Sequence, residues 1–368
     1  HMVSDVPIGC FLSGGLDSTL VATLMARESP VPINTFTIRF SSAAHDESPY
    51  AHMVAEHIGS RHTEHCVEMD AAASLHHLVE NFDEPFADSS LIPTYYVSKA
   101  AHERVTVALS GDGGDELFGG YNWYSWMVRL DEIGRRLGPL SLLAPALGQA
   151  WPRRLKGGAF VSALGLSPQR RFLDRVGCFS TDYKEALYTQ DFRDQLNGAD
   201  YAKTFMQRFK DCDGNLLQRM SLTDFHSYLP EDILTKVDRA SMAVSLETRV
   251  PWLDPEVIEF AFSVGSEFKI RNGQKKVLSK LLARKLAPPA LPLERKQGFS
   301  IPLQKWVRED LGDMLEESLC GNFAGSYLNA DQIRVMLKMH RSDPLSTKGF
   351  PLFAALNFSI WHQKYVVN

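Results

Sequence analysis

The segment SGGLDS, residues 13–18, combines the residue types that hold an anion. An apolar run ends at Leu12, two glycines follow, and a helical pattern begins at Asp17 or Ser18. Glycines allow the backbone to turn sharply and to approach a ligand closely. The backbone N–H groups at a helix N-terminus point toward such a ligand, and the helix dipole favours negative charge there. The segment therefore predicts an anion cradle.

A second glycine-rich loop, SGDGGDELFGGY at residues 110–121, is acidic and also follows an apolar run. In an open parallel sheet, ligands bind outside the carboxyl ends of the strands, so we expect both loops to face one crevice. Two glycines alone would be read as a structural turn. The flanking polar residues and the second loop favour a functional site. The first loop lacks the lysine of a Walker A motif and does not match GxGxxG.

Four strands and four helices in the first 120 residues must position these loops. We predict strands at 7–12, 33–40, 61–69 and 105–111, and helices at 18–29, 47–59, 71–82 and 91–103. This alternation is typical of an α/β fold with a doubly wound, mainly parallel sheet. Beyond Tyr121 the pattern is mostly helical, with loops at 151–158 and 286–303.

Composition excludes several classes of protein. The 368 residues are 44% hydrophobic, enough for a sizeable core, and the net charge of -5 argues against nucleic acid as the main partner. The five cysteines include no CxxC pair, which favours reduced thiols over disulfides or a zinc site. No apolar stretch approaches the ~20 residues that cross a bilayer, and no signal peptide precedes the first strand. We expect a cytoplasmic protein with no nucleic-acid and no membrane partner, and a homodimer stays open.

The SGGLDS segment resembles the signature of the PP-loop ATP pyrophosphatases. These enzymes cut ATP between the α- and β-phosphates and activate a substrate oxygen as its adenylate. The resemblance implies that the anion is the pyrophosphate of ATP. It also agrees with Mg²⁺ binding at Asp17, because Mg²⁺ takes one or two carboxylates together with phosphate oxygens and water.

Four further segments resemble the synthetase domain of the glutamine-dependent asparagine synthetases. They lie at 108–121, 232–254, 272–282 and 295–303. The resemblance implies a PP-loop α/β core at 3–120 that binds nucleotide, and a mostly helical portion at 121–368 that returns to complete the active site. Residues 1–2 resemble a cloning remnant. The implied activity is an ATP-dependent amide ligase that forms an acyl-adenylate and then transfers ammonia to it.

The resemblance also assigns ligand-binding residues. For ATP they are Leu12, Ser13, Gly14, Gly15, Asp17, Ser18, Ile38, Ser110 and Gly111. Among these, Leu12 and Ile38 would touch the nucleoside through their main chain. Asp115 matches the family's second magnesium carboxylate, so we expect Asp17 and Asp115 to share the metal.

Two residues are expected to act in the chemistry. Lys275 matches the family's phosphate-binding lysine, although Lys276 is an alternative one residue away. Asp112 occupies the place where many family members have glutamate, and such a carboxylate could accept a proton from the attacking amine. Asp is one methylene shorter than Glu, which changes its reach, and Glu116 is the next candidate base.

Substrate identity is less specific than reaction type. Aspartate is the first candidate, with Ser89, Ser90 and Asp115 as substrate-binding residues. The segment 83–96 carries no arginine, whereas family members have one that could clamp a carboxylate. Related domains make lactams or other amides, so a different carboxylate stays an alternative, as does a catalytically silent interaction domain.

The glutaminase half of the family uses an N-terminal cysteine nucleophile. Here Cys10 falls inside the first predicted strand, so no residue takes that role. We expect a glutaminase domain or subunit to have been removed, or ammonia or another amine to be taken directly or from a partner.

Overall fold

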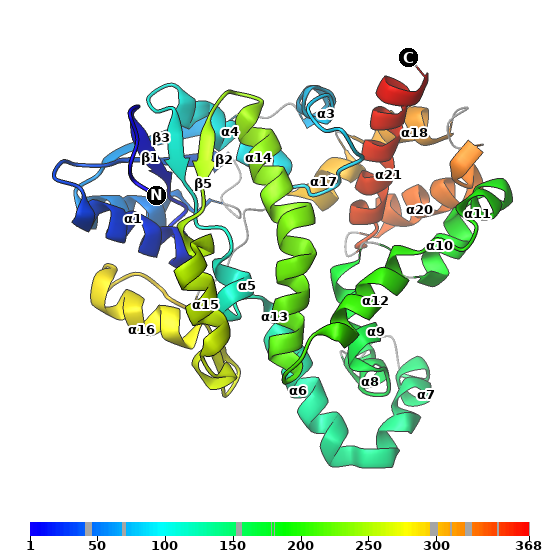
Figure 1. Ribbon diagram of the computed structural model, residues 1–368. Helices are drawn as coiled ribbons and strands as arrows, with labels where there is room; N and C mark the ends of the chain where they lie inside the picture. Colours follow the sequence, from blue (N-terminus) through cyan, green and yellow to red (C-terminus); the bar gives the residue numbers. More distant parts are fainter. Residues whose placement is uncertain are drawn as a thin grey trace.

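A parallel sheet forms the centre of the N-terminal half (Figure 1). The computed structural model describes residues 1–40, 46–67, 71–151, 157–177, 179, 181–294, 301–309, 311–320, 326–343 and 346–367. The strands of the sheet are β1 (Ile8–Phe11), β2 (Asn34–Phe40), β3 (Arg61–Val67), β4 (Val107–Leu109) and β5 (Glu247–Arg249). Their order is β3-β2-β1-β4-β5, and every neighbouring pair is parallel. The predicted α/β class is confirmed.

Helices cover both faces of this sheet because successive strand residues point to opposite sides. Cys10 and Leu12 pack in one core cluster with α1 (Leu16–Glu28) and α2 (Ser48–Ile58). Phe36 and Ile38 pack in the other, with α3 (Ala71–Val79), α4 (Leu91–His102) and α14 (Thr235–Met242). The doubly wound arrangement follows from this alternation.

The remaining helices lie mostly beyond residue 121. They are α5 (Gly114–Phe118), α6 (Asn122–Leu137), α7 (Ala144–Gln149), α8 (Gly158–Leu164), α9 (Pro168–Val176), α10 (Thr181–Leu187), α11 (Gln190–Leu196), α12 (Tyr201–Asp211), α13 (Leu216–His226), α15 (Pro255–Ser263), α16 (Val277–Leu286), α17 (Leu303–Arg308), α18 (Gly312–Cys320), α20 (Ala330–Ser342) and α21 (Gly349–His362). One group, α6, α9, α12 and α13, packs around Tyr124, Phe172 and Phe209. Another, from α17 to α21, shares the core of α3 and α4. None of the helices in the described ranges has the length and hydropathy to cross a bilayer.

Two segments from far along the chain reach the sheet. The stretch after α13 continues through a π-helical turn (Leu229–Leu234) into α14 and then into β5, which pairs with β4. A short hairpin, β6 (Ile270–Arg271) and β7 (Gln274–Lys275), leads into α16, which packs beside α1. Both segments therefore bring side chains to the edge of the sheet where β1 and β4 end.

Candidate active site

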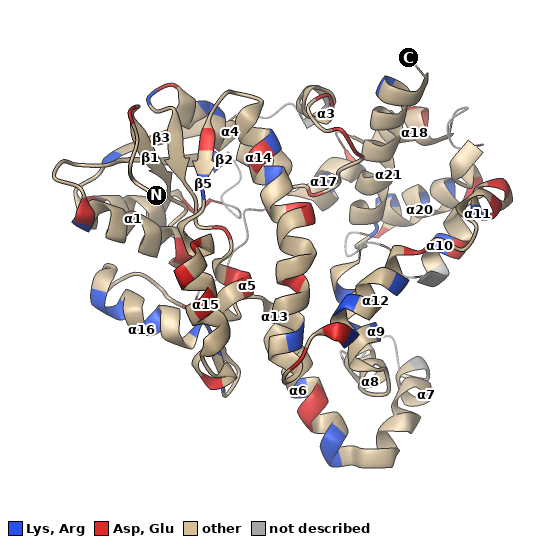
Figure 2. Cartoon of the chain, in the orientation of Figure 1, with Lys and Arg blue, Asp and Glu red and all other residues tan. Residues whose placement is uncertain are grey.

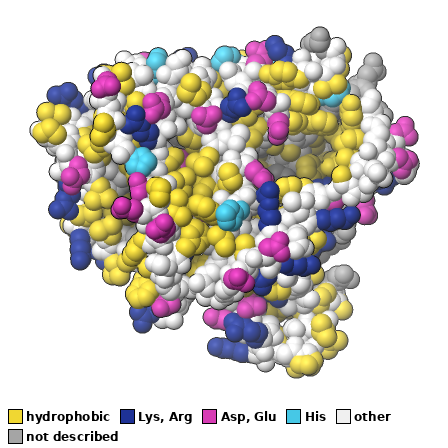
Figure 3. Space-filling model, in the orientation of Figure 1, with side chains coloured by type: hydrophobic (Ala, Val, Ile, Leu, Met, Phe, Trp, Pro, Cys, Tyr) yellow, Lys and Arg dark blue, Asp and Glu magenta, His cyan; other side chains and the backbone are white. Residues whose placement is uncertain are grey.

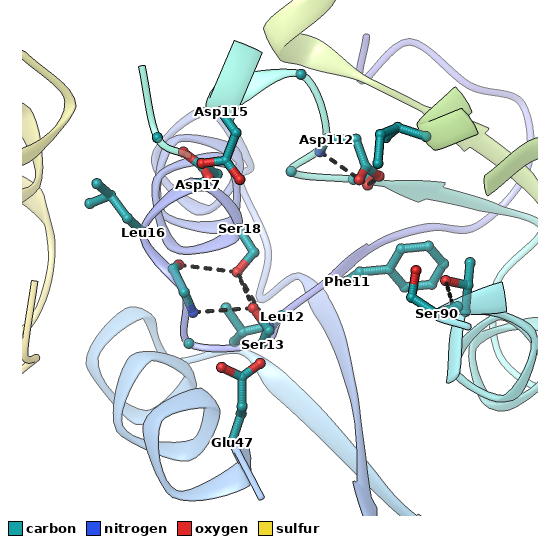
Figure 4. A pocket seen from close by; sticks show the side chains of 18 of the residues that line it. Phe11, Leu12, Ser13, Leu16, Asp17, Ser18, Glu47, Ser90, Asp112 and Asp115 are labelled. Carbon is teal, nitrogen blue, oxygen red and sulfur yellow. Dashed lines mark hydrogen bonds between the residues drawn. The ribbon is translucent and has the colours of Figure 1, made fainter. Parts of the chain in front are cut away.

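The loop between β1 and α1 is held by its own serines (Figure 4). The hydroxyl oxygens of Ser13 and Ser18 lie 3.0 Å apart, and the Gly15 N–H donates to Ser13 Oγ at 3.1 Å. Gly15 is the N-cap of α1 and offers no side-chain acceptor to the first turn. Within the described residues, no side chain caps the N-terminus of α1 at Gly15, and such an uncapped helix start suits an external anion.

Gly14 must be glycine for two reasons. Its φ of +74° lies in the left-handed region, and a Cβ there would fall 2.5 Å from the Cβ of Tyr50. Any side chain would separate the loop from the start of α2, which Tyr50 belongs to. The glycines predicted to allow a sharp turn therefore also allow close packing.

The second loop leaves β4 and leads into α5. Ser110 Oγ donates a hydrogen bond to Asp112 Oδ2, and Asp115 lies in the first turn of α5. Glu116 is buried, and Tyr121 Oη donates to its Oε1 at 2.5 Å. Burial and the charge of Asp115 raise the pKa of Glu116 to about 7.

Carboxylates from the two loops converge on one lysine, and we call Asp17, Asp115 and Lys276 the Lys276 cluster. The Lys276 ammonium donates to Asp17 Oδ2 and lies 2.6 Å from Asp115 Oδ1. Burial alone would lower the pKa of Lys276, but Asp115 and Asp17 outweigh burial and raise it, so the lysine stays charged. Its backbone has a φ of 53°, at the N-cap of α16.

Lys275, the lysine favoured by the sequence, lies apart from this cluster. Its ammonium donates to Asn122 Oδ1, at the start of α6. It lines the same cavity as Lys276. The structure thus places the two alternatives at different points of one cavity, and the second of them meets the carboxylates.

A second buried lysine, Lys236, reaches the cavity from α14. Its ammonium lies 2.8 Å from Asp88 Oδ2 and 2.8 Å from Ser90 Oγ, and Ser90 Oγ also donates to Asp88 at 2.7 Å. We call Asp88, Ser90 and Lys236 the Lys236 cluster. Lys236 lies within the segment 232–254 that carried the family resemblance, but its position opposite Ser90 depends on how α14 packs against α4.

Charged residues of both clusters shift the pKa of Asp112. Burial raises the pKa of Asp112 above its ordinary value, and the Lys236 charge lowers it in part. For Lys236 itself, burial lowers the pKa, whereas the charges of Asp88, Asp112 and Asp232 raise it, and the net direction is upward. Lys236 therefore supplies a permanent positive charge beside a buried carboxylate.

These groups line one cavity of about 540 Å³. Every residue that the sequence nominated for the site contributes to its wall: Leu12, Ser13, Gly14, Gly15, Asp17, Ser18, Ile38, Ser89, Ser90, Ser110, Gly111, Asp112, Asp115 and Lys275. Sequence reasoning missed Lys236, Glu47, and the aromatic wall of Tyr121, Trp123 and Tyr228. Residues 295–300 of the segment 295–303 lie outside the described residues.

The chemistry of the donors fits a hard divalent cation. Asp17 and Asp115 come from different loops and both reach the same cationic atom, Lys276 Nζ. Over the described residues, no group of three or more metal-ligating side chains gathers. Mg²⁺ suits such a site, because it binds through one or two carboxylates and takes its other oxygens from phosphate and water.

Comparison with known proteins gives the family of the chain. The asparagine synthase family model matches residues 1–363. Asparagine synthetase (glutamine-hydrolyzing) 1 of Bacillus subtilis is 31% identical over 364 residues, which cover 98% of this chain and 57% of that protein. A Mycobacterium tuberculosis protein named for the same activity is 34% identical over 374 residues, covering 100% of this chain and 56% of that protein.

A more distant relative carries a different name. Amidase chry2 of Gibberella zeae is 25% identical over 322 residues, which cover 75% of this chain and 45% of that protein. The chain spans little more than half the length of the two asparagine synthetases above. From the match over nearly its whole length, this chain belongs to the asparagine synthase family.

Proposed function

We propose that the chain is an ATP-dependent, amide-forming ligase. In this proposal a substrate carboxylate, with the aspartate side chain as first candidate, is converted to an acyl-adenylate with release of pyrophosphate, and ammonia then displaces AMP. The observation that carries the proposal is the Lys276 cluster. It brings two carboxylates and a buried ammonium to the uncapped start of α1 in one cavity.

The phosphates of ATP are assigned to the loop of residues 13–18. Backbone N–H groups at the start of α1 would bind the β- and γ-phosphates. Asp17 and Asp115 would hold Mg²⁺, which when bound neutralises phosphate charge and orients the oxygens. With these carboxylates engaged, the Lys276 ammonium is available to the departing pyrophosphate, so we assign the phosphate role to Lys276 rather than Lys275.

Adenylation forms one bond and breaks one. A carboxylate oxygen of the substrate attacks the α-phosphorus of ATP, and the bond from that phosphorus to the oxygen bridging the β-phosphorus breaks. Negative charge gathers on the pyrophosphate as it leaves. A buried cation at that point stabilises the transition state more than the ground state, which is the requirement for faster chemistry.

Aminolysis then forms the amide. The ammonia nitrogen attacks the acyl carbon, the bond to the AMP oxygen breaks, and one proton leaves the nitrogen. We assign that proton to Asp112, which is buried in the cavity wall near the charge of Lys236. Lys236 favours the ionised form of Asp112, and a general base must be ionised to accept a proton.

The Lys236 cluster also bears on which carboxylate is used. Segment 83–96 has no arginine, but Lys236 places a cation beside Ser90 from another helix. Because Asp88 already neutralises much of that charge, a substrate carboxylate would be bound less firmly than by an arginine. This favours keeping a second candidate, a ligase of the same superfamily that acts on another carboxylate.

The experiment is substrate-dependent exchange of labelled pyrophosphate into ATP, run with the purified chain and a panel of carboxylic acids. Exchange with aspartate supports asparagine synthesis. Exchange with a different acid alone supports the second candidate. Exchange with no acid, in a chain that still binds ATP, contradicts the proposal and supports a catalytically silent interaction domain.

Nitrogen is proposed to come from ammonia. The Bacillus subtilis relative, which is 31% identical, is named as glutamine-hydrolyzing, and this chain covers 57% of it. Cys10 is buried in β1, so it is not assigned to glutamine hydrolysis. Amide formation by the purified chain is therefore expected with ammonium and not with glutamine.

A further inference from the structure

A projection at the lower end of the molecule exposes large apolar side chains (Figures 1 and 3). It consists of the end of α6, a 3-10 turn (Gly138–Leu143) and α7. We call its outward apolar residues the leucine tip: Leu137, Leu140, Leu142, Leu143, Leu147 and Trp151, which are 40, 65, 74, 59, 58 and 37% exposed. Isolated exposed leucines are ordinary, but a contiguous group of this size marks an interaction surface.

The fold holds the leucine tip outward. The opposite side of α7 packs closely on α8, and a Cβ on Gly148 would lie 2.0 Å from Ser162 Oγ. Ala144 is buried in the same small cluster as Leu130 of α6 and Leu164 of α8. Since this face already fills the contact between the helices, the leucines have no interior position to occupy.

The sequence of this part of the chain is rich in basic residues. Residues 133–173 hold seven Lys or Arg and no Asp or Glu, and Asp131, Glu132 and Asp174 flank them. Among the seven, Arg171 is buried against the carbonyls of Leu164 and Leu166, and Arg170 pairs with Asp174, so neither belongs to the tip. Arg153, Arg154 and Lys156 lie outside the described residues. Arg135 and Arg136 are exposed at the end of α6, next to the leucine tip (Figure 2). Arg135 also pairs with Asp131 at 3.0 Å, near the solvent. Apolar and positive side chains thus share one projecting surface.

We propose that the leucine tip lies on an anionic lipid surface. Leucine and tryptophan inserted at the headgroup boundary, with arginines at its edge, are the features of a segment that rests in the membrane interface. Anionic headgroups attract each nearby Arg or Lys. A second copy of the chain is the less suitable occupant, because two basic tips would repel each other. The expectation of no membrane partner is based on membrane-spanning segments alone, and contact of the leucine tip with a lipid surface replaces it.

The test is co-sedimentation of the purified chain with lipid vesicles. Vesicles of phosphatidylcholine with about a quarter phosphatidylglycerol should pellet the chain, and phosphatidylcholine alone should bind it at least ~10-fold more weakly. Binding to the anionic vesicles should fall at high salt, because screening weakens attraction between exposed charges.

Two matched variants separate the leucine tip from apolar surface in general. Leu142→Asp with Leu143→Asp should lower binding by at least ~10-fold, since it replaces inserted side chains with charges of the wrong sign. Val335→Asp with Met339→Asp on α20, where the native residues are 51 and 53% exposed, should leave binding unchanged. Thermal unfolding should confirm that both variants are folded.

Three results would overturn the inference. One is no binding to anionic vesicles at low salt. Another is equal loss of binding in both variants. The third is a dimer of the unaltered chain in analytical ultracentrifugation that the Leu142→Asp/Leu143→Asp variant cannot form, because the leucine tip would then be an interface between copies.

Discussion

The Lys276 cluster and the Lys236 cluster each place a buried lysine among carboxylates, but they hold it differently. Lys276 lies at a helix N-cap with a φ of 53°, between carboxylates from two separate loops. Lys236 lies within α14 and is hydrogen-bonded to both Asp88 and Ser90, which are two residues apart. The positive φ of Lys276 is a strained backbone conformation, and such conformations tend to persist where function requires them.

This difference indicates that Lys276 and Lys236 have different roles in the same cavity. The carboxylates around Lys276 are those that a magnesium ion would bind, so Lys276 must be able to exchange partners when ATP enters. Lys236 is hydrogen-bonded to two residues of one segment, Asp88 and Ser90, so it can serve as a constant charge. The predictions below test whether adenylation depends on the first cluster and proton transfer on the second.

Replacing Lys276 should have the largest effect. Lys276→Ala should reduce pyrophosphate exchange by about 10³–10⁵-fold, the range seen when a cation that stabilises charge in phosphoryl transfer is removed. Nucleotide binding, followed by calorimetry, should survive because the backbone of residues 13–18 is unchanged. Lys275→Ala is the matched control and should stay within a few-fold of the unaltered chain. The reverse result would return the phosphate role to Lys275.

Replacing Asp112 should separate the two half-reactions. Asp112→Asn removes the proton acceptor but keeps the size of the side chain, so amide formation should fall by about 10²–10⁴-fold while exchange continues. Both activities are to be measured on the same preparation. Equal loss of both would make Asp112 a residue that shapes the loop, and Glu116→Gln would be the next variant to assay.

Replacing Asp115 should change the metal requirement. Loss of an outer-shell partner already costs about 10–100-fold in metal affinity, so loss of a direct ligand in Asp115→Asn should cost at least that much. The measurement is the Mg²⁺ concentration that gives half-maximal exchange, with the unfolding temperature as a check on folding. An unchanged Mg²⁺ requirement would remove Asp115 from the metal site.

Replacing Lys236 should produce a smaller, pH-dependent effect. Asp112 acts as a base only when ionised, so amide formation should fall as pH drops through its raised pKa. Lys236 lowers that pKa in part. Lys236→Met should therefore move the acidic limb of amide formation to higher pH and leave the pH profile of exchange in place. Parallel shifts in both profiles would indicate that Lys236 serves the structure of the cavity as a whole.

The part of the site that comes from the first 120 residues could be predicted, because its strands and loops follow from the local sequence pattern. Each predicted strand in the first 120 residues exists, and β1 and β4 end at the two glycine-rich loops. Parallel strands with short connections to helices leave those loops at one edge of the sheet, whatever the rest of the chain does. The nominated residues therefore meet in one cavity.

The part of the site that comes from residues beyond 121 could not be predicted, because it depends on packing between segments that are distant in the sequence. β5 has three residues, two of them charged, and gives no alternating pattern. Lys275 and Lys276 are neighbours at the end of a two-residue strand, and only the direction of α16 decides which one meets Asp17. Lys236 is one charge in a helix, and its approach to Ser90 comes from the contact of α14 with α4.

The central claim is that a substrate carboxylate attacks the α-phosphorus of ATP in this cavity. It is tested most directly with a carboxylic acid that supports exchange, labelled with ¹⁸O in its carboxyl group and converted to its amide with ammonium. Mass spectrometry of the nucleotide should find one ¹⁸O atom in AMP, together with unlabelled pyrophosphate. ADP as the product, with ¹⁸O in inorganic phosphate, would show attack at the γ-phosphorus and would contradict the account.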